Sequence, residues 1–236
     1  MSEITDKEKH FVTPGKMRPS QIITTFGPGS IVNFEKDSVL VKGIDFWANR
    51  DNYIQKNHIY LQKITKKSKF MMPYVSDKNQ ICISCKSFPQ WGYCTKNDCL
   101  LLQRHKPSPE KMNDRGTFFC KKHPWIPLLP ARLVMTCKQG HLDEFPWKYW
   151  AHSNQRENIA EKGNCQLNKL YFNVRPGFGA GWASLVVSCE CKASRSLSDL
   201  NGNPDILKSL GVKCSGKQPW EVPNSDSQEC GETPRP

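Results

Sequence analysis

The sequence predicts an α+β fold of small mixed elements, rich in loops and stapled by structural zinc sites. Only 37% of the 236 residues are hydrophobic, which makes a thin core for a chain of this length. The apolar runs are short and are interrupted by turn residues. Eleven cysteines recur in short-range pairs. Because loop-rich sequence buries too little apolar surface to order itself by packing alone, we expect metal ions to supply the missing stabilisation.

The composition suggests three segments. Residues 1–17 are polar and are broken by a Pro-Gly pair, so we expect a disordered tail. Residues 18–75 carry turn signals between short apolar runs and predict a small hairpin-plus-helix segment. Over residues 76–236, cysteine, tryptophan, proline and short loops dominate, which predicts a zinc-knuckle-rich region.

The hairpin-plus-helix segment is predicted to contain two helices and one hairpin. A short helix over residues 21–26 would end at the Gly-Pro-Gly turn that follows it. Strand-like runs at 30–34 and 38–42 predict a hairpin. Asp51 could cap a second helix over residues 53–64, in which apolar residues recur near helical spacing.

The zinc-knuckle-rich region is predicted to contain few regular elements. One short helix is expected within residues 141–150. The runs at 170–174 and 184–189 predict paired strands on either side of a glycine-rich loop. A further short helix is expected over residues 205–210, and Gly211 would end it.

Composition and charge bear on location and partners. No run of about 18 apolar residues occurs and the mean hydropathy is −0.62, so no transmembrane helix and no membrane partner are expected. The N-terminus lacks the apolar segment of a secretory signal, which indicates a cytoplasmic protein. With 34 basic against 22 acidic residues, the formal net charge of +12 favours a polyanionic partner, nucleic acid first. In a reducing cytosol, clustered thiols usually bind metal.

Four lysines on or just after the second predicted helix are candidate nucleic-acid-binding residues. They are Lys63, Lys66, Lys67 and Lys69. They would form a strip of positive charge that faces phosphates, although a solvated helix face explains the same pattern. Seven tryptophans could stack on nucleobases, but tryptophans more often pack over small metal knuckles.

The first candidate zinc site combines two closely spaced pairs of ligands. Its members are Cys94, Cys99, Cys120 and His123. Each pair fits one knuckle, and a tetrahedral Zn2+ would close the loop between the two knuckles. Cys82 and Cys85 lie just upstream and compete for the same role, and inert buried thiols are the alternative interpretation.

A second candidate set flanks the helix that is expected within residues 141–150. Its members are Cys137, His141, His152 and Cys165. The helix could present both imidazole rings toward one ion. A histidine beside tryptophans is, however, often just a packed and hydrogen-bonded ring.

The third candidate set is made of cysteines alone. Its members are Cys189, Cys191, Cys214 and Cys230. The Cys-x-Cys pair at a strand end places two sulfurs near one turn, and the other two come from downstream loops. Because these ligands are far apart in the sequence, a different pairing of the cysteines remains open. A zinc ion in each set would add a charge of −1 with three cysteines and one histidine, 0 with two of each, and −2 with four cysteines. Together the three ions and their thiolates would lower the formal net charge to about +9.

We expect two or three structural zinc ions and no enzymatic activity. Each set can supply four ligands, whereas a catalytic zinc keeps an open position. The sequence lacks an HExxH motif, a phosphate-binding loop and a Gly-x-Ser-x-Gly elbow. A metal-dependent nuclease that uses His141 and Asp143 is the alternative. Asp143 and Glu144 in the first turn of a helix are explained more simply by the helix dipole.

Several motifs spread along the chain occur together in one known family. They are Arg18-Pro-Ser-Gln-Ile-Ile-x-x-Phe26-Gly-Pro-Gly-Ser-Ile-Val, Gly43-Ile-Asp-Phe-Trp47, Phe88-Pro-x-Trp91, Pro130-Ala-Arg132-Leu-Val, Cys137-x-x-Gly-His141-Leu-Asp-Glu-Phe-Pro-Trp-x-x-Trp150-x-His152, Cys189-x-Cys191 and Cys214-x-Gly216-x-x-Pro-Trp220. Together they resemble DrmB-type proteins, which are components of the DISARM antiphage defence system of bacteria and archaea. The block that ends at His152 is the most specific.

The resemblance implies a non-catalytic zinc-binding subunit that partners a DrmA-like superfamily 2 helicase and helps to engage foreign DNA. A protein–protein scaffold without DNA contact is the alternative among binding proteins. Members of the family are longer and carry a further C-terminal domain. This chain would therefore correspond to the N-terminal, zinc-rich part of the family, and a separate C-terminal half would be a further partner.

Overall fold

The structure is a computed structural model, and part of the chain is described in it. The described residues are 19–34, 37–47, 54–55, 59–71, 74–75, 81–105, 117–153, 165, 169–175, 177, 181, 184–203, 205–222 and 230–236. The tail expected over residues 1–17 lies outside them. Of the helices in the described part, none has both the length and the apolar character that crossing a membrane requires.

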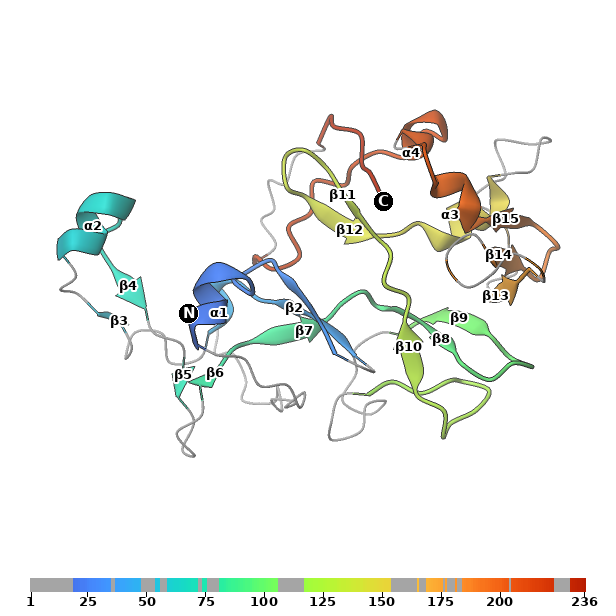
Figure 1. Cartoon of the computed structure of the whole chain (residues 1–236), viewed down its shortest axis with the longest axis horizontal. Helices are drawn as coiled ribbons and strands as arrows, with labels where there is room; N and C mark the ends of the chain where they lie inside the picture. The colour runs from blue at the N-terminus through green and yellow to red at the C-terminus, as the bar shows by residue number, and fades with distance from the viewer. Residues whose placement is uncertain are drawn as a thin grey trace.

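The largest element is a six-stranded antiparallel sheet with the strand order β10-β8-β9-β13-β14-β15 (Figure 1). Its strands are β8 (Trp91–Cys94), β9 (Leu101–Arg104), β10 (Leu128–Pro130), β13 (Leu170–Val174), β14 (Leu185–Cys189) and β15 (Ser194–Ser196). Most neighbours are close in sequence, but β13 pairs with the distant β9, so that Leu170 lies opposite Leu102. This long-range pairing joins the two halves of the sheet.

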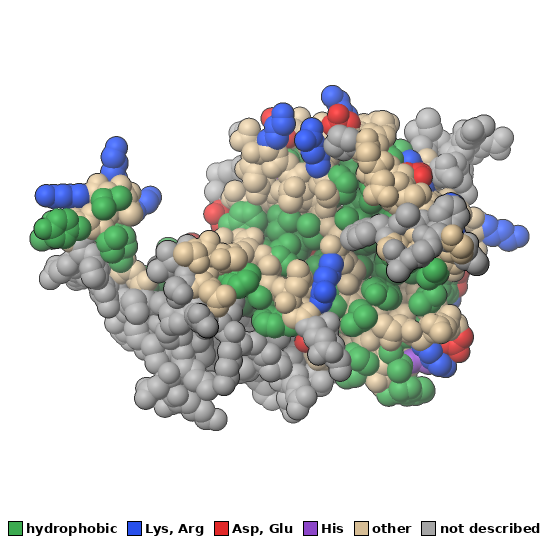
Figure 2. Space-filling view, viewed as in Figure 1, with side chains coloured by type: hydrophobic (Ala, Val, Ile, Leu, Met, Phe, Trp, Pro, Cys, Tyr) green, Lys and Arg blue, Asp and Glu red, His purple; other side chains and the backbone are tan. Residues whose placement is uncertain are grey.

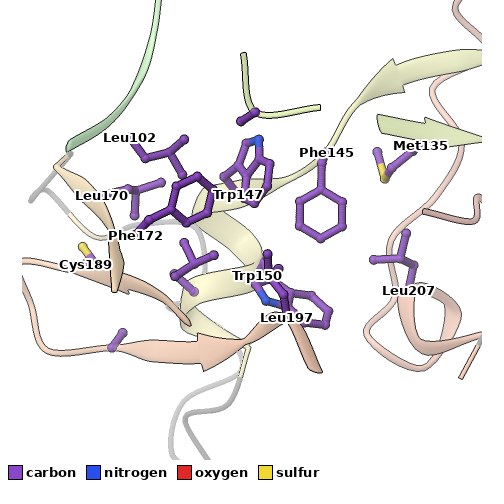
Figure 3. Close-up of a cluster of buried hydrophobic side chains, with 14 of the residues drawn as sticks. Leu102, Met135, Phe145, Trp147, Trp150, Leu170, Phe172, Cys189, Leu197 and Leu207 are labelled. Carbon is purple, nitrogen blue, oxygen red and sulfur yellow. The ribbon is translucent and has the colours of Figure 1, made fainter. Parts of the chain in front are cut away.

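The helix α3 (Trp147–His152) packs on β14 and β15 and supplies the centre of the main core (Figure 3). Trp147 and Trp150 are almost completely buried. The ring of Trp147 meets the ring of Phe172 edge to face, with centroids 5.4 Å apart, and it meets Phe145 at 4.7 Å. Such aromatic pairs add roughly 0.5–1.5 kcal/mol beyond the burial of their area. A few large side chains therefore hold this core together.

A three-stranded antiparallel sheet has the order β1-β2-β7. Its strands are β1 (Ile31–Asn33), β2 (Ser38–Val41) and β7 (Cys85–Ser87), and α1 (Pro19–Thr24) precedes them. Trp220, from near the C-terminus, packs against this unit. Its backbone carbonyl accepts a hydrogen bond from the Gly43 amide at 2.7 Å, and a Cβ at Gly29 would lie 3.0 Å from its ring. The downstream segment thus covers the first hairpin.

The remaining elements are short. They are η1 (Ile44–Phe46), β3 (Ile54–Gln55), α2 (Ile59–Thr65), β4 (Phe70–Met71), β5 (Tyr74–Val75), β6 (Ile81–Cys82), β11 (Val134–Thr136), β12 (Leu142–Glu144), η6 (Leu197–Leu200) and α4 (Ile206–Ser209). β3 pairs with β4, β5 with β6, and β11 with β12. The helix α2 has no buried residue and projects from the body, at the left of Figure 1.

The structure confirms the α+β class and several of the predicted elements. The hairpin of β1 and β2, the paired strands β13 and β14, and the short helix α4 all lie where the sequence predicts them, whereas the first helix begins and ends two residues earlier than predicted. Gly211 has φ +76°, a left-handed conformation that glycine adopts without strain, directly after α4.

Two predicted helices are wrong in their first halves. Residues 54–55 form a strand that pairs with β4, and the helix begins only at Ile59. Residues 142–144 form β12, which pairs with β11. The helix α3 starts after Pro146, which has no amide hydrogen to donate. The Pro146 carbonyl accepts a hydrogen bond from the Trp150 amide at 2.8 Å. In both places, pairing with a strand that lies outside the predicted helix overrides the local periodicity.

Candidate metal centres

Three clusters of cysteine and histidine lie within the described residues. Centre 1 is Cys94, Cys99, Cys120 and His123; centre 2 is Cys137, His141, Cys214 and Cys230; centre 3 is His152, Cys165, Cys189 and Cys191. In each centre the four ligand atoms lie within 4.8 Å of one another. Every centre therefore has the same donor set of three cysteines and one histidine.

Centre 1 joins two turns at one end of the large sheet. Cys94 is the last residue of β8, and Cys99 lies in the turn that leads into β9. Cys120 and His123 lie in the turn before β10, and the Cys94 and Cys120 sulfurs are 3.6 Å and 3.9 Å from Nδ1 of His123. The sulfurs of Cys99 and Cys120 are 3.9 Å apart. All three cysteines are buried, and they form a small core of their own with Leu101 and other residues.

Centre 2 connects the hairpin of β11 and β12 to the C-terminal segment. Cys137 and His141 occupy the turn of that hairpin, with the sulfur 3.3 Å from Nδ1 of His141. Gly140 has φ +79° and allows the tight turn between them. The Cys214 sulfur lies 3.7 Å from the same Nδ1. Cys230 completes the set from the last described segment.

Centre 3 is built against the main core. His152 is the last residue of α3 and is 2% exposed. Its Nδ1 lies 2.6 Å from the Lys148 carbonyl oxygen, to which an N–H there donates, and this leaves Nε2 to face the Cys191 sulfur at 3.1 Å. Cys165 and Cys189 have their sulfurs 3.9 Å apart. The histidine of this centre thus presents Nε2, whereas those of centres 1 and 2 present Nδ1.

The spacing of the ligand atoms fits a tetrahedral zinc ion. Zinc–sulfur bonds of about 2.3 Å place two sulfurs of a tetrahedron about 3.8 Å apart, and sulfur–nitrogen separations are slightly shorter. The observed sulfur–sulfur separations of 3.9 Å agree with this and far exceed the roughly 2.05 Å of a disulfide. The ten cysteines with described side chains form no disulfide bond with one another. The three donor sets can therefore each hold a metal such as zinc.

Backbone amides favour the thiolate form of one cysteine in each centre. Burial opposes ionisation of Cys137, but amides that include the one of His141 lower its pKa to about 7. Burial also opposes ionisation of Cys191, yet the Ala193 amide and nearby side chains lower its pKa to about 7. The pKa of Cys120 is lowered, against the effect of burial, by the amides that follow it. Each turn thus prepares a thiolate ligand.

A second cysteine of each centre shows the opposite shift. Burial, together with a neighbouring thiol in the same centre, raises the pKa of Cys94, Cys189 and Cys214 to about 11. Thiolates so close together repel one another, so a bound cation is needed for all of them to ionise. The electrostatics of the centres therefore agrees with their geometry.

The structure brings together all twelve predicted metal ligands, but two of the predicted groupings are wrong. The grouping of centre 1 is the predicted one. The pair Cys137 and His141 meets Cys214 and Cys230, and the other pairs meet in centre 3. The expected helix between His141 and His152 is interrupted by β12, so it cannot carry both rings to one ion. That the twelve residues bind metal stays a prediction.

One cysteine whose side chain is described belongs to none of the three centres. Cys85 is in β7, half-buried, and belongs to the small core around Val41. Burial raises its pKa to about 11, opposed by the charge of Lys42. It therefore fits a packed thiol better than a metal ligand. The side chain of Cys82 lies outside the described part.

The candidate phosphate-binding lysines and the two acids after His141 lie outside the metal centres. Lys63, Lys66, Lys67 and Lys69 are all exposed, on α2 and just beyond it. Asp143 forms a salt bridge with Lys217 at 3.0 Å, and the Glu144 carboxylate accepts a hydrogen bond from the Gln90 amide at 2.7 Å. Burial raises the pKa of Glu144. Because both acids lie on β12 rather than in a helix, the predicted helix-dipole role for them is wrong.

Comparison with known proteins places the chain in a family. A family model described as a domain of unknown function, DUF8724, matches residues 18–236. The chain is also 30% identical over 204 residues to the DISARM protein DrmB of Bacillus paralicheniformis, over 83% of this chain and 32% of that protein. It spans about a third of the length of the curated relative that it matches. This similarity confirms the predicted resemblance, and the chain belongs to the DUF8724 family, related to DrmB-type proteins.

Proposed function

We propose that the chain is a non-catalytic, zinc-stabilised subunit of a DISARM-like antiphage defence complex in the cytoplasm. Its relationship to DrmB supports a place in such a complex. The observation that carries the proposal is the donor set of the centres, since each has three cysteines and one histidine. A tetrahedral zinc with four protein ligands has no open position for water or substrate, so its role is structural.

The proposed partner is a DrmA-like superfamily 2 helicase, and the chain holds its loops in fixed positions for that partner. Loops that metal fixes in advance lose less freedom on binding. The helix α2 supports a protein contact because Ile59, Tyr60 and Ile64 are 62%, 84% and 78% exposed. Figure 2 shows apolar side chains beside basic ones on the projecting part at the left, where Figure 1 places α2.

The chain also helps to engage foreign DNA, through phosphates and without reading bases. Three thiolates and one Zn2+ add a net charge of −1 per centre, so three zinc-loaded centres lower the formal net charge of +12 to about +9. The chain stays basic, which supports a polyanionic partner. The exposed lysines at positions 63, 66, 67 and 69 are the proposed phosphate contacts.

The test measures zinc content, helicase retention and DNA binding on the same purified, zinc-loaded chain. We expect three zinc ions by native mass spectrometry, co-purification with the helicase, and a steep fall in DNA affinity between about 50 and 200 mM salt. Reversing Lys63, Lys66 and Lys67 to glutamate should weaken DNA binding and leave the zinc content unchanged. Lys208→Glu, on the exposed side of α4, is the control and should weaken binding much less.

The outcomes separate the proposal from its alternatives. Retained helicase with no DNA binding, or with binding that salt does not change, would support a scaffold without DNA contact. Magnesium-dependent cleavage of DNA that Asp143→Asn abolishes would contradict the non-catalytic role. Fewer than three zinc ions in the folded wild-type chain would contradict the assignment of the missing centre.

A further inference from the structure

One tryptophan of the described part differs from the rest in its exposure. Trp125 is 70% exposed, whereas Trp147 and Trp150 are buried and the other described tryptophans are half-buried. Exposing most of an indole ring forgoes the stabilisation that its burial would give. Trp125 lies two residues after His123, in the metal-binding turn of centre 1. Its exposure on a metal-binding turn makes it a candidate contact for a ligand.

The turn holds Trp125 in a defined position. The Ile126 amide donates to the His123 carbonyl at 2.9 Å, and the Cys120 amide donates to the Ile126 carbonyl at 3.0 Å. These bonds close the loop around the residue from both sides. The Trp125 ring meets the His123 ring at 6.0 Å with an interplanar angle of 67°. A metal in centre 1 would fix this loop further, so the exposed ring is preorganised.

Basic residues accompany the ring on the same turn. Lys121 and Lys122 are both exposed. The ammonium group of Lys122 lies 3.5 Å from the Tyr171 hydroxyl and 5.2 Å from the centre of its ring. Among the described residues, Asp98 forms a salt bridge with Lys96 at 3.0 Å and Glu190 with Lys169 at 2.9 Å. The turn therefore carries an exposed aromatic ring and two exposed lysines within five residues of chain.

We propose that Trp125, Lys121 and Lys122 form a binding site for a single-stranded segment of nucleic acid. The indole stacks on an unpaired base, and the two ammonium groups contact the flanking phosphates. This combination binds single strands with little sequence preference, because every base has a flat face. The inference rests on the DNA engagement proposed above and assigns it a second surface, far from α2 (Figure 1).

The surroundings of the ring favour nucleic acid over a protein partner. A protein interface centres on a contiguous apolar patch. The large exposed apolar residues of the described part include none adjacent in sequence to Trp125, whereas two lysines lie in its turn. In a duplex the bases are already stacked, so an unpaired base is the partner that an isolated indole can bind.

The test is the affinity of the zinc-loaded full chain for fluorescein-labelled oligo(dT), measured by anisotropy. Trp125→Ala should weaken binding about ten-fold, which is within the range measured for loss of one stacked base. Trp125→Phe keeps an aromatic face and should retain most of the affinity. Ile44→Ala, which removes another exposed apolar side chain, is the matched control and should bind as the wild type does. Zinc content and melting temperature should be the same for all four proteins.

Two further arms define the ligand. Replacing Lys121 and Lys122 by glutamine should reduce the slope of log affinity against log salt by about 1.4, the value for two phosphate contacts to a single strand. Oligo(U) should bind as oligo(dT) does and be weakened equally by Trp125→Ala, whereas a blunt duplex should be insensitive to that substitution. Equal binding of oligo(dT) by wild type and Trp125→Ala would overturn this inference alone. No binding of any nucleic acid by the wild type would overturn the proposed DNA engagement as well.

Discussion

Centres 1 and 2 have the same donor set but join very different parts of the chain. The ligands of centre 1 all come from residues 94–123, at the ends of neighbouring strands of one sheet. Those of centre 2 come from residues 137–141 and 214–230. Each doubling of loop length adds only about 0.6 kcal/mol to the cost of closing a loop. A metal can therefore join distant segments almost as readily as adjacent ones, and centre 2 uses this to anchor the C-terminal segment.

Centre 3 differs from both because it is continuous with the main core. Cys189 belongs to the same buried cluster as Trp147, Trp150 and Phe172, and His152 is 2% exposed. Centre 2 lies at the edge, where Cys230 is half-buried and Arg235 pairs with Thr136 through two backbone hydrogen bonds. Loss of metal from centre 3 should therefore destabilise the whole fold, whereas loss of Cys230 from centre 2 should loosen only the C-terminal segment.

Removal of all metal should have the largest effect. We expect a chelator to abolish the near-ultraviolet circular dichroism that arises from the buried Trp147 and Trp150, because the three centres hold the segments that enclose this core. The signal should return when zinc is added back under reducing conditions. A metal-free chain that kept the full signal would contradict the structural role of the centres.

Single ligand substitutions should separate centre 3 from centre 2. Cys189→Ser should lower the free energy of unfolding by about 4 kcal/mol or more, as expected for loss of a buried metal ligand in the core. Cys230→Ser should cost less, about 1–2 kcal/mol, and should instead speed hydrogen exchange at the Thr136 and Arg235 amides. Each variant should lose one zinc ion, measured by native mass spectrometry. Equal losses of stability would show that the two centres are equally coupled to the core.

A smaller, pH-dependent effect is expected near centre 1. Burial, with the charge of Arg104 nearby, lowers the pKa of His105 to about 4, and its ring stacks on Phe118 with centroids 3.5 Å apart. The unfolded chain binds this proton with a pKa of about 6.5. Stability is therefore fully present above pH 6.5 and is lost as the pH falls toward 4.

The variant His105→Phe keeps the stacked ring and removes the titrating group. Its denaturation midpoint should fall less than that of the wild type between pH 7 and pH 5, by an equivalent on the order of 1 kcal/mol, because the folded wild type resists the proton that the unfolded chain binds at pH 5. Zinc content is followed at each pH, so that loss of metal is not mistaken for protonation of His105. An identical acid response in the two proteins would contradict the assignment.

The sequence predicts short-range features of this fold well. The turns that hold Cys94 with Cys99, and Cys120 with His123, follow from spacing alone because a few residues of chain fix where both ligands point. The hairpin of β1 and β2 is also local. The grouping of the other ligand pairs depends on contacts between segments distant in sequence. The packing of α3 on β14 brings His152 to Cys189 and Cys191, and the hydrogen bonds of Thr136 and Leu142 to Arg235 and Lys217 hold the C-terminal segment beside Cys137 and His141.

The amino-acid sequence by itself determined which residues are available as metal ligands, the knuckles they form, the basic charge and the relationship to DrmB-type proteins. It did not determine that all three centres have three cysteines and one histidine. The sequence predicted one such set, one of two cysteines and two histidines, and one of four cysteines. Nor did it distinguish the exposed Trp125 from the buried Trp147 and Trp150. Only the tertiary structure decided these, because ligand pairs meet and side chains are buried through contacts between distant segments, which local spacing does not encode.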